Sequence, residues 1–331
     1  MSNSLQNKLT HDQITVIFQH GFGSGVKLNL VQPLEGGTFN ETYLIELEGK
    51  PRMVLRVAPP DTADVYWDDV ALMRREYHVL PFFAPIADLM PSIVLTNFTH
   101  QIVDRDYMFQ TFIEGERWSD IESTLSVDEN NNLWQQCGRI VRRIHNTTGE
   151  RFGYPYPGPQ FKSWSGMILD RFAKISESLM IHKLEIPSFA IISGIVHANA
   201  SLLDEIQTPS LLHGDLWTFN LLISQNTGEP TITGVLDVER AWWGDPLADW
   251  IMFLLDIRNN DTEWQGQLSA FNKGYGKSES NKSTQFRQEI YKAMHIGTSA
   301  IWATRHGDTE SILRARQELG EIAQVLPPLS E

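Results

Sequence analysis

Polar residues set among short apolar runs constrain this 331-residue chain more than any other feature of its sequence. The polar residues are, in chain order, His213, Asp215, Asn220 and Asp237. They lie beside the ends of the apolar runs 210–212, 221–223 and 231–236, which have the length and the aliphatic or β-branched composition of buried strands. The sequence therefore predicts a group of strand ends that carry carboxylate and amide side chains.

These residue types suit phosphoryl transfer. That reaction needs a carboxylate beside the attacking hydroxyl and hard oxygen ligands for a Mg²⁺ ion on the phosphates. We interpret Asp215 as the carboxylate that accepts the hydroxyl proton, and Asn220 and Asp237 as the Mg²⁺ ligands. His213 is interpreted as a structural group that fixes the loop. The alternative is a solvated hairpin whose Asp and Asn side chains only cap turns.

Recognisable motifs begin in this loop and continue downstream of it. They run Leu212-His213-Gly214-Asp215-Leu216-Trp217 with Asn220, then Val235 to Glu239, then Gly244-Asp245-Pro246 with Asp249. Together they resemble the aminoglycoside phosphotransferase family of small-molecule kinases. The resemblance implies an α+β, two-lobed, protein-kinase-like fold, with an antiparallel sheet and a helix in the N-lobe and a larger, mainly helical C-lobe. The N-lobe is expected over 1–114 and the C-lobe over 115–331.

The resemblance also implies an activity. Gly214 stands where protein kinases carry an Arg, and Val238-Glu239 replaces Phe-Gly, so a small molecule is expected as the acceptor rather than a peptide. ATP or GTP is the expected co-substrate. The first expectation is an aminoglycoside-type antibiotic O-phosphotransferase. The alternatives are a metabolic kinase of the fructosamine, choline, methylthioribose or homoserine type, and a nucleotide-binding pseudokinase, against which the intact Asp215 argues.

A glycine turn between two predicted strands lies near the N-terminus. Gly36, Gly37 and Thr38 separate the strands expected over 28–34 and 42–48. Glycines let backbone amides approach an anion, so these three residues are expected to contact the nucleotide phosphates. An ordinary hairpin turn is the simpler alternative.

Arg56, inside the strand predicted over 53–57, stands where kinases carry a phosphate-contacting Lys. Its guanidinium keeps the positive charge and adds a bidentate fork, so the role can survive the replacement. The expected partner is Glu76, on a helix predicted over 69–80. In the alternative interpretation Arg56 and Glu76 are ordinary surface charges.

The strand that follows is expected to lead into the hinge. The resemblance assigns Gln110, Phe112 and Ile113 to this segment, where the backbone binds the purine edge and apolar side chains cover its faces. Because backbone groups would make these contacts, the side chains do not distinguish ATP from GTP.

Charge and composition exclude several classes of protein. The chain carries 27 Lys and Arg against 41 Asp and Glu, a net charge of −14, which disfavours nucleic acid and anionic membranes as partners. Its one cysteine, Cys137, excludes an internal disulfide and favours a reducing compartment. There is no signal-peptide pattern at the N-terminus and no apolar run of about 18 residues. We therefore expect a cytoplasmic monomer or homodimer.

An acidic, aromatic stretch from Asp245 to Glu263 is the expected acceptor-binding region. Its acidic residues are Asp245, Asp249, Asp256, Asp261 and Glu263, with four tryptophans nearby. Acidic groups beside aromatic faces suit a cationic acceptor, whereas the alternative is a solvated face with core tryptophans. Within the stretch, Asp245 is expected to cap a helix that starts at Pro246. The family resemblance implies that Asp249 braces the catalytic loop. His145, at a predicted helix end, is left outside the site.

Overall fold

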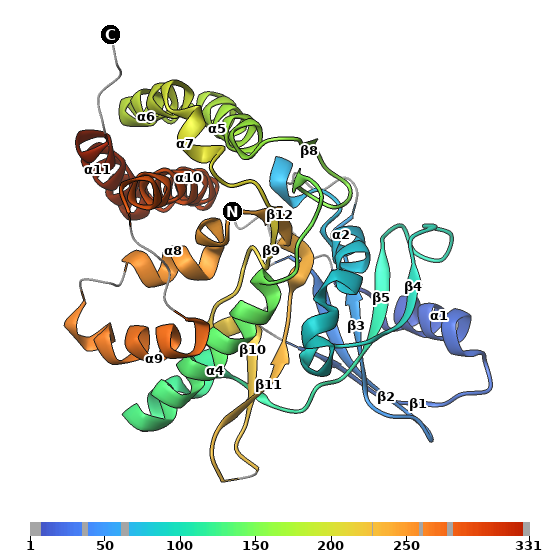
Figure 1. Ribbon diagram of the computed structural model, residues 1–331. Helices are drawn as coiled ribbons and strands as arrows, with labels where there is room; N and C mark the ends of the chain where they lie inside the picture. Colours follow the sequence, from blue (N-terminus) through green and yellow to red (C-terminus); the bar gives the residue numbers. More distant parts are fainter. Residues whose placement is uncertain are drawn as a thin grey trace. The chain divides into compact units, whose positions relative to one another are not determined.

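The computed structural model describes residues 8–34, 39–60, 66–226, 228–257, 261–276 and 281–326 (Figure 1). The chain forms two compact units. The first unit takes in residues 1–124 and 218–240, and the second takes in 125–217 and 241–331. The chain thus passes between the units at three points, whereas the sequence predicts one boundary, at Gly115.

The first unit is built on a five-stranded antiparallel sheet. Its strands, in spatial order, are β1 (Leu28–Pro33), β2 (Glu41–Leu47), β3 (Met53–Val57), β5 (Tyr107–Thr111) and β4 (Ile93–Asn97). Helix α1 (His11–Phe22) precedes the sheet, and α2 (Leu72–Val79) lies between β3 and β4 in the chain. Thr10 and Gln13 form the capping box that opens α1.

Side-chain alternation gives this sheet two distinct faces. Leu55, Val57 and Phe109 pack with α1 in one apolar cluster. Successive strand residues point to opposite faces, so Arg56 and Gln110 point away from that cluster. Both donate hydrogen bonds to Glu76 of α2, which therefore belongs to the opposite face. The sequence of β3 thus places one buried cation on the α2 side of the sheet.

A second, three-stranded sheet completes the first unit. It consists of β11 (Thr231–Val235), β10 (Leu221–Ser224) and β6 (Glu116–Arg117), with β10 in the middle. The 3₁₀ turns η4 (Thr218–Asn220) and η5 (Val238–Arg240) adjoin the same end of the β10–β11 hairpin, since Leu221 pairs with Val235. This hairpin end brings Asn220 and Asp237 together.

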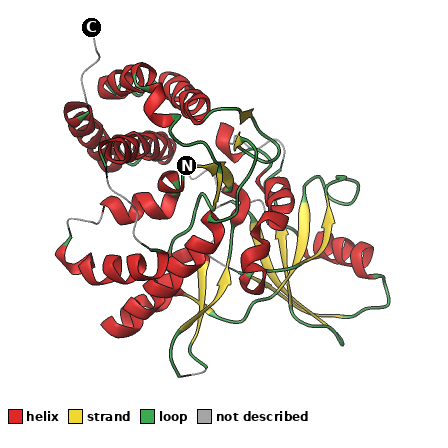
Figure 2. Cartoon of the chain, in the orientation of Figure 1, coloured by secondary structure: helices red, strands yellow, loops and turns green. Residues whose placement is uncertain are grey.

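The second unit is mainly helical (Figure 2). Its α-helices are α4 (Val127–His145), α5 (Trp164–Ile181), α6 (Pro187–Ala198), α7 (Ala200–Leu203), α8 (Trp250–Ile257), α9 (Gln265–Tyr275), α10 (Lys282–His306) and α11 (Thr309–Val325). A small sheet of β8 (Gln160–Phe161), β7 (Phe152–Gly153), β12 (Trp242–Gly244) and β9 (Ser210–Leu212) lies among them. Across the described residues of both units, no helix is long and apolar enough to span a membrane.

Helices α4 and α9 approach each other unusually closely, because glycines face the partner backbone. A Cβ atom on Gly274 would overlap the carbonyl oxygen of Gln135, and one on Gly138 would overlap that of Phe271. Trp134 packs edge-on against Phe271 in the same interface, with ring centroids 6.5 Å apart. The glycines therefore set the distance between these helices.

Replacing Gly274 by alanine should lower the free energy of unfolding by about 1–3 kcal/mol, because the backbone of α4 must move to admit the new methyl group. The control is Gly320→Ala in α11, where no atom lies within 4 Å of the added Cβ. That variant should be neutral or up to about 1 kcal/mol more stable, since alanine favours a helix. Urea unfolding of both variants measures the difference, and equal stabilities would contradict the close packing.

Candidate active site

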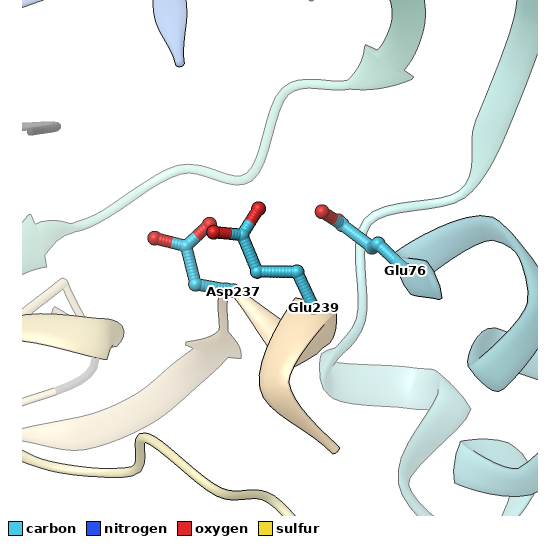
Figure 3. A group of neighbouring side chains, drawn as sticks. All are labelled: Glu76, Asp237 and Glu239. Atoms are coloured by element: carbon cyan, nitrogen blue, oxygen red, sulfur yellow. The ribbon is translucent and has the colours of Figure 1, made fainter. Parts of the chain in front are cut away.

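A buried guanidinium lies among three carboxylates in the first unit. Arg56 Nη1 donates to Glu76 Oε2 at 2.5 Å, and Arg56 Nη2 donates to Asp237 Oδ1 at 2.6 Å and to Glu239 Oε2 at 3.1 Å. Figure 3 shows the three carboxylates turned toward one another, Glu76 from α2 and the other two from the segment around η5. The structure therefore contains the predicted Arg56–Glu76 ion pair and adds Glu239 to it.

Burial and charge shift the acid–base behaviour of this cluster. Burial alone would lower the pKa of Arg56, but the carboxylates of Glu76, Asp237 and Glu239 raise it well above its ordinary value. Burial raises the pKa of Glu76, and burial together with the negative charge of Asp237 raises that of Glu239 to about 8. One cation thus faces three acids, and the raised pKa values reflect burial and mutual repulsion that a further cation would relieve.

Of the three carboxylates, Asp237 is the most accessible. Its side chain is 39% exposed, whereas those of Glu76 and Glu239 are 2% and 9% exposed. Its φ of +58° lies in the left-handed region, which Asp tolerates better than most residues and which is common at functional sites. The amide of Leu236 donates to the carbonyl of Asn220 at 2.9 Å, which fixes Asn220 next to Asp237.

The donor chemistry here fits a magnesium–nucleotide complex. Asp237 and Asn220 offer the hard oxygen ligands that Mg²⁺ prefers, and Arg56 adds a permanent positive charge for phosphate. When bound, such an ion neutralises charge on the phosphates. The two other carboxylates have partners of their own: Gln110 Nε2 donates to Glu76 Oε1 at 2.9 Å, and Asn40 Nδ2 donates to Glu239 Oε2 at 3.0 Å.

The loop that carries Asp215 belongs to the second unit, where Asp249 holds it. Asp249 is buried, and its carboxylate accepts from the amides of His213 at 3.0 Å and of Gly214 at 2.8 Å. Burial acts to raise the pKa of Asp249, but hydrogen bonding from His145 and its charge outweigh burial and hold that pKa below its ordinary value. This is the bracing contact that the sequence predicts for Asp249.

His145 is a part of this arrangement that sequence reasoning missed. Its Nε2 lies 3.0 Å from Asp249 Oδ2, and its Nδ1 lies 2.9 Å from the hydroxyl of Tyr275. Helix α4 is therefore linked through Asp249 to the loop that carries Asp215, and α9 contacts His145 in turn. A histidine at the last position of a helix gives no signal of such a partner in the sequence, because the partner is 104 residues away.

Other predicted site residues have different surroundings. Gly36, Gly37 and Thr38 lie outside the described residues. The Gln110 side chain is buried against Glu76, and the amide of Phe112 donates to the carbonyl of Arg52 at 3.3 Å. Ile113 packs next to Gly234: a Cβ atom on Gly234 would lie 3.2 Å from Ile113 Cγ2. The contacts expected between this segment and a purine stay predictions.

In the acidic stretch, three of the acids have internal hydrogen-bonding or ion-pair partners. Asp245 caps η6 (Pro246–Ala248) and accepts from Arg287 Nε at 3.0 Å, and Asp256 pairs with Lys292 at 2.8 Å. Asp249 contacts His145, as described above. The side chain of Glu263 lies outside the described part of the chain. These pairs stabilise the second unit and reduce the negative charge available to an acceptor.

A family model described as the phosphotransferase enzyme family, APH, matches residues 30–286. The chain belongs to the phosphotransferase enzyme family. This membership confirms the resemblance seen in the motifs around Asp215 and Asp237, and it confirms the expected enzyme class, a phosphotransferase. The matched range contains Arg56, Glu76 and Glu239 as well.

Two relatives of this phosphotransferase are described as probable ketoamine kinases. The protein from Synechocystis sp. is 28% identical over 179 residues, which is 50% of this chain and 56% of the relative. The protein from Vibrio vulnificus is 25% identical over 271 residues, which is 80% of this chain and 83% of the relative. The match thus spans little more than half of the first relative.

Solved structures of aminoglycoside phosphotransferases share the fold. APH(4)-Ia is 16% identical with a TM-score of 0.66, covering 95% of this chain and 99% of that one. APH(2″)-IIa, solved with streptomycin and ATP, is 17% identical with a TM-score of 0.61, covering 96% and 97%. This likeness confirms the predicted α+β, two-lobed, kinase-like fold.

Replacing Asp249 by asparagine should lower the free energy of unfolding by about 3 kcal/mol at neutral pH, because two amides and His145 lose their anionic partner. The stabilisation from a carboxylate with a lowered pKa is present above its ordinary value of 3.8 and is lost as pH falls through the lower folded value. The difference from wild type should therefore narrow in acid.

Denaturant unfolding at a series of pH values measures this effect. Asp104→Asn, at an exposed position, is the control and should change stability by less than about 0.5 kcal/mol. A pH-independent difference between Asp249→Asn and wild type would argue against a charged brace.

Proposed function

We propose that this chain is a Mg²⁺-requiring kinase that transfers the γ-phosphate of ATP or GTP to a hydroxyl group of a small molecule. The observation that carries the proposal is the buried Arg56–Glu76 ion pair next to the half-exposed carboxylate of Asp237. A permanent cation for phosphate oxygens and an accessible carboxylate for a metal are the two groups that phosphoryl transfer needs on the nucleotide side.

Each residue has a separate role in this proposal. Asp237 and Asn220 hold the metal, and Arg56, aligned by Glu76, contacts the α- and β-phosphates. Asp215 orients the acceptor hydroxyl and takes its proton as the bond to phosphorus forms and the bond to the leaving nucleoside diphosphate breaks. Only four residues separate Asp215 from Asn220 in sequence, and Asp249 holds the amides just before Asp215.

Either purine nucleotide suits the proposal. Among the similar structures, APH(4)-Ia is described with the ATP analogue AMP-PNP, and an aminoglycoside 2′-phosphotransferase-IIIa mutant is described with GDP. We infer that Ile113 and its neighbours contact the base mainly through backbone groups and apolar surface.

A ketoamine, a sugar adduct of an amine, is our first candidate for the acceptor. It is supported by the two probable ketoamine kinases, the most similar of which is 28% identical, against 16–18% for the aminoglycoside phosphotransferases. It is also supported by Asp245, Asp249 and Asp256, whose charges are engaged inside the second unit, because a polycationic acceptor needs several available acids.

An aminoglycoside, the first expectation from sequence, is the second candidate. The shared fold and the net charge of −14 favour it. Asp261, which is exposed in the described structure, is an acid from the stretch that a cationic acceptor can approach.

Asp215→Asn should reduce turnover by two or more orders of magnitude, because the variant cannot accept the hydroxyl proton. Nucleotide affinity should be unchanged, since Asp215 is not assigned to phosphate or metal. Turnover is measured as acceptor-stimulated release of nucleoside diphosphate, and affinity by calorimetry. A variant with turnover within a few-fold of wild type would show that Asp215 is not the base. A wild-type protein that binds nucleotide and transfers phosphate to no acceptor would favour the pseudokinase alternative.

The class of acceptor can be determined by assaying a panel of candidate acceptors at two salt concentrations. Wild-type protein is assayed with Mg²⁺, ATP or GTP, and a fructosamine, hygromycin B, streptomycin or a neutral ketose. We expect the fructosamine to give the highest kcat/KM, with a KM that changes little between 50 and 300 mM salt. A polycationic acceptor held by exposed acids would instead show a KM that rises with salt, because exposed pairs are screened over roughly 8 Å. Preferred turnover of an aminoglycoside would reverse our order of candidates.

A further inference from the structure

The third carboxylate on Arg56 needs an explanation, because Arg56 already has a partner in Glu76. Glu239 lies two residues after Asp237 and is buried, with its side chain 9% exposed. Its Oε2 accepts from Arg56 Nη2 at 3.1 Å and from Asn40 Nδ2 at 3.0 Å. These contacts direct Glu239 toward the sheet and the guanidinium, while the exposed member of the cluster is Asp237.

The same Arg56 nitrogen binds two different acids. Nη2 donates to Glu239 and, at 2.6 Å, to Asp237. A carboxylate that turns toward a metal gives up part of its interaction with a neighbouring cation. Nη2 would then lose its shorter hydrogen bond, the one to Asp237. Glu239 would remain as the acceptor for Nη2. Glu76, on Nη1, fixes only the other arm of the fork.

The fork geometry also accounts for an arginine at this position. A guanidinium presents several donors in a rigid plane and can bridge Glu76 and Glu239 at once. A lysine offers a compact point charge on a flexible stem and holds one direction less well. Arg56 and Glu239 are therefore matched to each other.

We propose that Glu239 is a positioning residue that keeps the Arg56 guanidinium in place when Asp237 turns to a metal–nucleotide, and that it is not itself a metal ligand. The inference rests on the proposed function in one respect, that the ligand is a Mg²⁺–nucleotide complex. It does not depend on the identity of the acceptor. It predicts that Glu239 acts on the metal through Arg56, so the effect of losing Glu239 depends on which residue occupies position 56.

A double-mutant cycle tests this dependence. The measured quantity is metal linkage, the ratio of AMP-PNP dissociation constants without and with Mg²⁺, obtained by calorimetry for wild type, Glu239→Gln, Arg56→Lys and the double variant. We expect Glu239→Gln to lower metal linkage about tenfold in the Arg56 protein, the size of one hydrogen bond to a charged group. In the Arg56→Lys background the same change should lower it less than about threefold. Equal losses in both backgrounds, or no loss in either, would overturn the proposal, because direct ligation or through-space attraction acts in both.

Two further variants keep the test independent of Arg56→Lys, should that protein fail to fold. Glu239→Asp retains the charge but shortens the reach, and we expect it to lose metal linkage as Glu239→Gln does. Normal linkage in Glu239→Asp would overturn the proposal, since charge alone would then suffice. Glu48→Gln removes an exposed carboxylate after β2 and is the matched control, with unchanged linkage expected. If the wild-type protein phosphorylated no acceptor, that result would count against the proposed function. The metal-linkage measurements would still test the role of Glu239, because they need no acceptor.

Discussion

The first unit depends on one buried cation. Without the guanidinium of Arg56, the carboxylates of Glu76 and Glu239 would face each other and Asp237 in a site with little water, where like charges repel strongly. Removing one partner from such a buried group is far more costly than removing an exposed pair. The sheet, α2 and the segment around η5 are thus held in register by a single side chain of β3.

In the second unit a buried anion, the carboxylate of Asp249, has the corresponding role. Asp249 gathers two loop amides and one imidazole around a buried carboxylate, so the peptide groups before Asp215 have fixed partners rather than solvent. Gly214, with φ of +81°, supplies the backbone conformation that lets its amide point at Asp249. A loop supported in this way is preorganised, because its geometry is fixed by the folded state before any ligand arrives.

Sequence patterns predicted those parts of the structure that depend on local periodicity or on a motif. The strand over 53–57 and the helix over 69–80, observed as β3 and α2, follow from apolar spacing, and the pairing of Arg56 with Glu76 follows from motif position. Strand β12 was not predicted, because Trp242-Trp243-Gly244 becomes a strand by pairing with β9, some thirty residues earlier, and with β7, which lies earlier still.

The missed site residues share one property: each acts through a partner distant in sequence. Glu239 meets Asn40 across 199 positions, and His145 meets Tyr275 across 130. The internal partners of the acidic stretch could not be predicted for the same reason, since Arg287 and Lys292, which pair with Asp245 and Asp256, lie on a later helix. A second acidic residue two places after Asp237 was the available signal for Glu239.

The discontinuity of the first unit has a consequence for biosynthesis. Residues 218–240 complete a unit whose other part ends at 124, so the ribosome must finish 93 intervening residues of the second unit before β10 and β11 can add to β6. Domains generally fold from the N-terminus as they emerge. During that interval Arg56 has Glu76 as its partner, while Asp237 and Glu239 have not yet been made. A nascent chain therefore completes the cluster around Arg56 only after residues 125–217 of the second unit have been made, and truncation before residue 237 removes Asp237 and Glu239 from that cluster.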